Sequence, residues 1–250
     1  MDDIALYALG NMTNSSSAMF ERRRRILNEA RKMIGSGGLD AFSIRELCKR
    51  AGVASRTLYY AFDSKENIIA LAIGSYFEEF ERRLQFDRHP ASLESAIQQQ
   101  ITTTLRNQQI PNYLKAVAAL YFSPSLHPRI REVLLTIGGR AWKPWIQTLV
   151  LHRQLQKGVD GETLLIDLSN LLFAKVHEWG LGILSNEEFQ DRTIDAVLIH
   201  LAGAAKGVAL STVRDAFVRW RGDSGYHAGL IADARARLAA MSSDRSDQQP

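Results

Sequence analysis

The sequence predicts an all-α protein: an N-terminal three-helix helix-turn-helix domain, joined by one long helix to a larger helical domain. Three observations support this fold class. The 250 residues include only 6 Pro and 17 Gly, so few positions interrupt a helix. Apolar residues recur at the three- and four-residue spacing of helices along most of the chain. No segment shows the strict apolar–polar alternation of a half-buried strand.

We expect the first 18 residues to form a mobile arm, because they end in the polar run Asn14-Ser15-Ser16-Ser17. They carry Asp2 and Asp3 where a signal peptide would carry basic residues, so we expect no signal peptide. No apolar run reaches the roughly 18 residues that span a bilayer. The one cysteine, Cys48, excludes an internal disulfide and is expected to be a small buried packing residue. We therefore expect a cytoplasmic protein without membrane contact.

A first helix is predicted from Met19 to Ile34, where apolar residues form one stripe. Four consecutive arginines, Arg22 to Arg25, precede most of that stripe and must point around the helix, some toward a phosphate backbone and others toward water. The run Gly35-Ser36-Gly37-Gly38 ends this helix.

The stretch from Ser43 to Glu66 predicts two short helices around a tight turn. Ser43 is a good N-cap, and Glu46 three residues later predicts a capping box. Gly52 can adopt the left-handed conformation that such a turn needs. The positions predicted to face inward are mostly apolar and small: Ile44, Leu47, Cys48, Ala51, Val53, Leu58 and Phe62.

The outer face of the second short helix, predicted from about Ala54 to Phe62, predicts binding to double-stranded DNA. It carries Ser55, Arg56, Thr57, Tyr59 and Tyr60. Exposed aromatic rings make a poor surface toward water, whereas hydroxyl, aromatic and guanidinium groups suit phosphates and base edges. Residues 19–66 also contain 11 Lys/Arg against 6 Asp/Glu. Charge alone would favour a solvated helix face, but charge together with this helix favours nucleic acid.

A long connecting helix is predicted from Ser64, as N-cap, to about Gln85. A series of helical patterns fills residues 86–240, and 241–250 reads as a disordered tail. Within the series, one pattern runs from Pro128 to Gln156 with a bend near Gly138-Gly139 and Pro144. The two most apolar patterns span 161–184 and 187–205. Their apolar faces are wider than one neighbour covers, so they lie either in the domain centre or against a second copy.

Residues 20–85 resemble the DNA-binding domain of the TetR family of bacterial transcriptional regulators. The run AGVASRTLYYAFDSKENII carries the resemblance through its glycine turn, Thr-Leu-Tyr, phenylalanine and Ser-Lys-Glu. The resemblance implies that Thr57, Tyr59 and Lys65 hold phosphates and that Ser55, Arg56 and Tyr60 face bases, with Arg45 added from the preceding helix. Two residues depart from the family pattern. Ala54 replaces the serine cap, which shifts the cap to Ser55, and Ala61 replaces a His or Tyr that would contact phosphate.

The same resemblance implies a homodimeric regulator, a repressor released from a pseudopalindromic operator by a small, mostly apolar or aromatic ligand. An activator is the alternative, and a helical enzyme or scaffold is a weaker one. The last two long helices would form the dimer interface, through Leu168, Leu172, Trp179, Ile194, Val197 and Leu201. The middle helices would hold the ligand, through Tyr113, Tyr121, Trp142, Trp145, Phe173 and His177.

Motifs for catalysis or metal binding are missing from the sequence. The six histidines are scattered, and none forms a His-x-x-x-His pair or a His/Cys cluster. There is no Gly-x-Ser-x-Gly motif and no nucleotide fingerprint. We therefore expect no enzyme activity, no cofactor and no metal.

Overall fold

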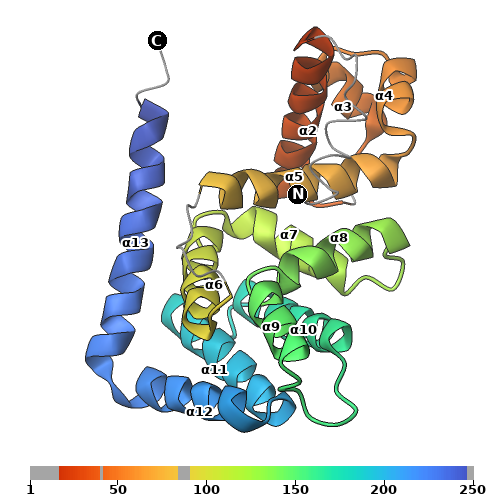
Figure 1. Ribbon diagram of the computed structural model, residues 1–250. Coiled ribbons are helices and arrows are strands. Elements are labelled where there is room, and N and C mark those ends of the chain that lie inside the picture. Colours follow the sequence, from red (N-terminus) through yellow and green to blue (C-terminus); the bar gives the residue numbers. More distant parts are fainter. Residues whose placement is uncertain (1–16, 40–41, 84–90, 247–250) are drawn as a thin grey trace. The chain divides into compact units, whose positions relative to one another are not determined.

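The computed structural model describes residues 17–39, 42–83 and 91–246, and these are almost entirely helical (Figure 1). The predicted arm, apart from its last two residues, and residues 247–250 of the predicted tail lie outside the described residues. The helices are α2 Ser17–Gly37, α3 Ile44–Ala51, α4 Ser55–Phe62, α5 Lys65–Arg83, α6 Leu93–Asn107, α7 Pro111–Tyr121, α8 Pro128–Gly139, α9 Lys143–Leu151, α10 Gly161–Gly180, α11 Asn186–Ala204, α12 Gly207–Gly222 and α13 Ser224–Ser246.

Several helix boundaries differ from the prediction. Helix α2 runs from Ser17 to Gly37, beyond the predicted Met19 and Ile34. The pattern from Pro128 to Gln156 is two helices rather than one bent helix. Gly138-Gly139 weakens the end of α8, and Pro144 is favoured in the first turn of α9 because the amide hydrogen it lacks would have no helical partner there. Helix α10 ends at Gly180, before the predicted Leu184. Helix α13 continues past the predicted boundary at Ala240 to Ser246.

The described residues fall into two compact units. Unit 1 consists of the described residues within Met1–Arg82 and Asn112–Ile137, and unit 2 of those within Arg83–Pro111 and Gly138–Pro250. Helix α7 and most of α8 therefore pack with the N-terminal helices, whereas the sequence analysis assigned them to the larger domain. Helices outside the contiguous segment 19–85 therefore also pack against the helices of the N-terminal domain.

The core of unit 1 joins the helix-turn-helix to the helices around it. Each helix contributes residues that are almost fully buried: Ile26, Ala30 and Ile34 of α2, Leu47 of α3, Leu58 and Phe62 of α4, Ile68 and Ile73 of α5, and Val117 and Ala118 of α7. These positions follow the three- and four-residue spacing within each helix, so one stripe per helix meets the others. Burying this apolar surface fixes α3 and α4 against α2 and α5.

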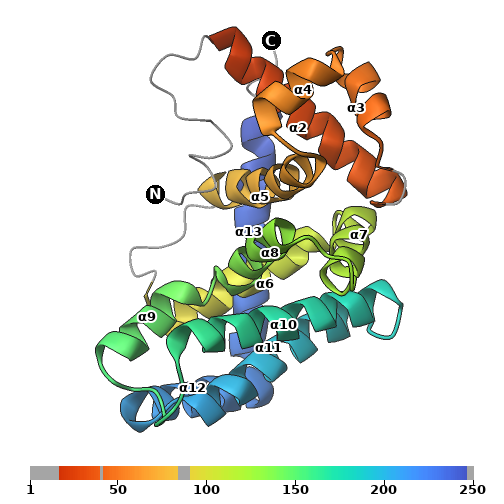
Figure 2. The same cartoon turned by 90° about the vertical axis from the view of Figure 1, so that its right-hand side faces the viewer.

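In unit 2, α10 and α11 lie side by side (Figure 2) and share a core with α6, α9, α12 and α13. Helix α13 runs along α6, where the Gln98 side chain donates to the backbone oxygen of Leu230 and to Asp233. An isolated antiparallel bridge between Leu155 and Ala205 ties two connecting loops together. In the part of the chain that the structure describes, no helix is long and apolar enough to cross a membrane.

Candidate nucleic-acid interface

Helix α3 and the turn after it follow the sequence prediction closely. The Ser43 hydroxyl accepts from the backbone N–H of Glu46, and Gly52 has φ +64° at the C-terminal end. That left-handed conformation closes the helix and lets the chain turn into α4. The Glu46 carboxylate accepts from Arg50 at 2.9 Å, so the predicted capping box is present only in its Ser43 half. Cys48 is half-buried rather than buried, with its sulfur 3.4 Å from the Ser55 hydroxyl.

Helix α4 separates into one inner and one outer face. Leu58 and Phe62 are 0% and 1% exposed, whereas Tyr59 and Tyr60 are 45% and 88% exposed. Ser55 and Arg56 are also exposed, and Thr57 is half-buried. The N-cap is Ala54 and makes no side-chain bond, so the expected shift of the cap to Ser55 is wrong. The outer face therefore presents a guanidinium, two phenols and small hydroxyls, all able to bond phosphates or base edges.

Lys65 and Arg45 flank this face. Lys65 is half-buried in the first turn of α5, with its ammonium 5.7 Å from the centre of the Phe42 ring. This cation–π interaction stabilises the ammonium group and restricts the aliphatic part of the Lys65 side chain. Arg45 is exposed on α3.

The four arginines of α2 divide into two pairs. Arg23 donates to the backbone oxygen of Ala61 and lies over the Phe62 ring at 4.4 Å. Burial lowers the pKa of Arg23, an effect that Asp63 opposes. Arg25 donates to the backbone oxygen of Ala51 at 3.0 Å. Because the last carbonyls of a helix lack helical partners, Arg23 and Arg25 hold the C-terminal ends of α4 and α3.

The other two arginines, Arg22 and Arg24, are exposed, and Arg24 pairs with Glu21 at 3.0 Å. The sequence pattern predicted that the run divides between DNA and water. It did not indicate that two of the arginines bond backbone oxygens of the helix-turn-helix.

Asn67 is a polar residue of α5, three positions after the predicted N-cap Ser64. Its backbone N–H donates to the Ser64 hydroxyl at 3.0 Å, as that cap requires. Its side-chain amide donates to the backbone oxygen of Phe62 at 2.8 Å, and its oxygen accepts from Arg129 at 2.8 Å. Asn67 is only 6% exposed. A buried amide with both ends bonded is held in a single orientation.

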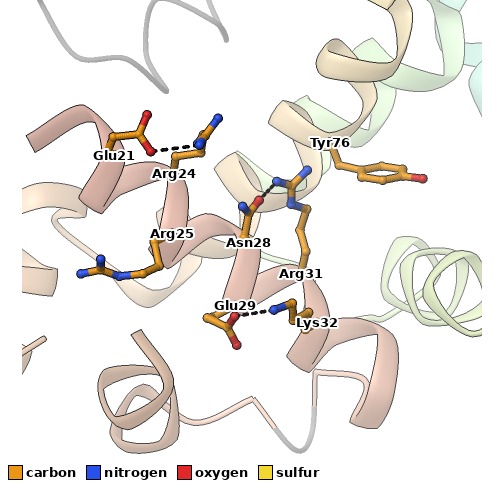
Figure 3. A pocket seen from close by; sticks show the side chains of 8 residues that line it. All are labelled: Glu21, Arg24, Arg25, Asn28, Glu29, Arg31, Lys32 and Tyr76. Atoms are coloured by element: carbon orange, nitrogen blue, oxygen red, sulfur yellow. Dashed lines mark hydrogen bonds and ion pairs between the residues drawn. The ribbon is translucent and has the colours of Figure 1, made fainter. Parts of the chain in front are cut away.

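A groove of about 520 Å³ lies along α2 beside Tyr76 of α5 (Figure 3). Most of its charged side chains are paired: Glu21 with Arg24, Glu29 with Lys32, and Arg31 with Glu79 and Asn28. Apart from Tyr76, every residue that lines the groove is charged or polar. We therefore interpret the groove as a charged surface and not as a pocket for an apolar ligand.

The six residues expected to hold a ligand are divided between the two units. Tyr113 and Tyr121 belong to α7 in unit 1, while Trp142, Trp145, Phe173 and His177 belong to unit 2. Trp142 is fully buried and donates through its indole N–H to Gln100, whose amide donates to Thr104. These buried polar residues on α6 were missed, although the mixture of Gln and Thr on an otherwise apolar helix face is visible in the sequence.

The six residues expected at the dimer interface are in the core of the chain itself. Leu168, Leu172, Trp179, Ile194, Val197 and Leu201 are at most 9% exposed. They are buried because α10 and α11 turn their most apolar faces toward each other and toward the other helices of unit 2. The interface assignment of these residues stays a prediction. The apolar residues that remain accessible on the two helices include Ile166, 43% exposed, and Ile199, 61% exposed.

Comparison with known proteins gives consistent results. Residues 26–72 match the model for bacterial regulatory proteins of the tetR family. The transcriptional repressor KstR of Rhodococcus jostii (strain RHA1) is 30% identical over 132 residues, which cover 52% of this chain and 62% of KstR. The transcriptional regulator UidR of Escherichia coli (strain K12) is 34% identical over 79 residues, 32% of this chain and 39% of UidR. The chain thus spans less than two thirds of the length of these relatives.

Solved structures share the fold at low identity. FadR of Bacillus subtilis, solved with stearoyl-CoA, has a TM-score of 0.55 at 17% identity and covers 72% of this chain and 98% of its own. RolR, solved with resorcinol, has a TM-score of 0.55 at 16% identity over 82% of this chain and 97% of its own.

The fold and the outward face of α4 define a helix-turn-helix protein with an appended helical body. Over residues 26–72, which contain this motif, the chain matches the tetR family of bacterial regulatory proteins.

Proposed function

We propose that this protein is a homodimeric, sequence-specific DNA-binding repressor that a small molecule releases from its operator. The observation that carries the proposal is the outer face of α4, where Tyr60 is 88% exposed beside Arg56 and Ser55. A large aromatic ring left in water on a short helix gains its stabilisation only when a partner covers it. A DNA major groove accepts a helix of this width.

In this proposal the side chains of α4 have two roles. Arg56 and Tyr60 read base edges, and Ser55 assists them. Thr57, Tyr59 and Lys65 bond phosphates, with Arg45 as an outer phosphate contact. Phosphate contacts set the position of the helix on the duplex, and base contacts set its sequence preference. Replacing Lys65 with Ala should therefore weaken all duplexes about equally, whereas replacing Arg56 should change the preferred sequence.

Dimerisation supplies the second half of the operator. The accessible residues Ile166 on α10 and Ile199 on α11 offer an apolar surface on two adjacent helices, and a second copy of this chain would cover both. Two α4 helices related by a two-fold axis would enter successive major grooves about 34 Å apart. The DNA site would then be a pseudopalindrome, and the protein would act beside the bacterial chromosome in the cytoplasm.

The effector is proposed to be a small, mostly apolar or aromatic molecule. The support is the aromatic content of α7, α9 and α10, together with the small-molecule complexes of two proteins that share the fold. Stearoyl-CoA and resorcinol differ greatly in size and charge, so the fold does not select the effector. A 100-fold loss of operator affinity requires about 2.7 kcal/mol of coupling between effector and DNA.

The test starts with selection of duplexes from random DNA by the purified full-length chain, followed by binding at several salt concentrations. We expect a pseudopalindromic sequence, a dimer by light scattering and a strong decrease in affinity with salt. In vitro transcription from a promoter that carries the selected site then distinguishes a repressor from an activator. A monomer that ignores every duplex would refute the proposal and favour the enzyme or scaffold alternative.

A further inference from the structure

The C-terminal end of the recognition helix α4 is held from outside the helix-turn-helix. Phe62 is its last residue, so the Phe62 carbonyl has no partner within α4. The Asn67 amide donates to that carbonyl at 2.8 Å. The adjoining Asp63 has φ +64°, an unusual conformation for a residue with a side chain, and its N–H donates to the Tyr59 oxygen. The position at which α4 ends is thus fixed by specific bonds.

Arg129 of α8 fixes the orientation of that amide. Its Nε donates to the Asn67 side-chain oxygen at 2.8 Å, although the two residues are 62 positions apart in the sequence. With the oxygen taken by Arg129, the amide nitrogen must face Phe62. A charged donor on one end of an amide also strengthens the bond made by the other end. Two consecutive hydrogen bonds therefore connect α8 to the recognition helix, and both lie within unit 1.

We propose that Arg129 is a positioning residue for α4 and that it acts through Asn67. The proposal rests on the proposed DNA-binding function. Arg129 fixes the Asn67 amide, and the amide holds the carbonyl end of α4. Loss of Arg129 would therefore lower operator affinity without removing a contact to DNA.

The first experiment is a double-mutant cycle on the selected operator, with Arg129→Ala, Asn67→Ala and the double variant. Each single variant should bind about tenfold more weakly, as expected for a lost hydrogen bond to a charged group. The double variant should bind no more weakly than Asn67→Ala, because both residues act through one connection. Arg131→Ala is the matched control: it removes the same charge from an exposed position on the same helix and should bind like the wild type.

Salt dependence separates positioning from phosphate contact. A plot of the logarithm of the operator association constant K against log salt should keep the wild-type slope in Arg129→Ala, since no phosphate contact is lost. Additive losses in the cycle, or a slope reduced by about 0.9, would overturn the assignment of Arg129.

Amide hydrogen exchange supplies a readout that does not depend on DNA. In folded Arg129→Ala, or in Arg129→Lys should the alanine variant fail to fold, the N–H groups of Asp63 and Ser64 should exchange faster than in the wild type. Unchanged exchange would refute the connection even if affinity fell. A wild-type protein that binds no duplex would refute the proposed function, while exchange would still decide whether Arg129 holds α4.

Discussion

Replacing Arg23 by alanine should damage folding, whereas the same change at the neighbouring Arg22 should damage only DNA binding. Arg23 donates to the Ala61 carbonyl and lies 4.4 Å from the centre of the Phe62 ring. Arg22 is exposed. The two variants lose the same charge at adjacent positions, so a difference between them reports on the contacts alone.

The magnitude follows from the two contacts of Arg23. A hydrogen bond from a charged donor contributes about 1.5–3 kcal/mol, and a partly exposed cation–π contact about 0.5–1 kcal/mol. The contacts share one side chain and are not additive. We therefore expect Arg23→Ala to lower the free energy of unfolding by about 2–3 kcal/mol. Arg22→Ala should change it by less than about 0.5 kcal/mol.

Urea unfolding measures the stability difference, and operator titration at several salt concentrations measures the DNA contacts. Losing one phosphate contact lowers the slope of log K against log salt by about 0.9. We expect that decrease for Arg22→Ala and an unchanged slope for folded Arg23→Ala. The reverse pattern, with Arg23→Ala stable and its slope reduced, would show that Arg23 binds DNA and does not hold α4.

Four further predictions concern other parts of the chain. Gly52→Ala should cost about 1 kcal/mol of unfolding free energy by urea unfolding, because alanine is strained at φ +64° although the space around it is open. Trp142→Ala should cost about 3–5 kcal/mol in the same measurement, because the indole is fully buried. Ile199→Arg should leave the fold intact and shift light scattering from dimer to monomer; an unchanged dimer would exclude α11 from the interface. The bond from the Thr163 N–H lowers the pKa of Asp160. The wild type should therefore melt higher than Asp160→Asn above about pH 3.9, and this advantage should vanish as the pH falls through the lowered native pKa.

Local patterns in the sequence predicted the helix-turn-helix well. The Ser43 cap, the left-handed Gly52 and the division of α4 into inner Leu58 and outer Tyr60 all depend on residues within a few positions of each other. Such features depend on residue type and spacing, so they can be predicted from the sequence. The end of α8 at Gly139 was harder, because a glycine pair permits a bend and a break equally.

Contacts between distant residues were not predictable in the same way. Arg23 and Arg25 bond backbone oxygens 38 and 26 positions away. Because every residue has a backbone oxygen, the sequence does not indicate which one a side chain will bond. The predicted dimer residues illustrate a related point. Apolar periodicity identifies a buried helix face, but it does not say whether the covering surface belongs to the same chain. Leu168 and Leu201 are covered by the protein's own unit 2.

The assignment of Asn112–Ile137 to unit 1 bears on the engineering of chimeric regulators. A fusion that grafts only the first 83 residues onto a foreign sensor would leave out the residues of α7 that complete the core of unit 1. It would also leave the Asn67 oxygen without the Arg129 guanidinium that it accepts from. A functional graft would need both segments, and hence two crossover points. In this protein the portable DNA-reading module is discontinuous along the gene.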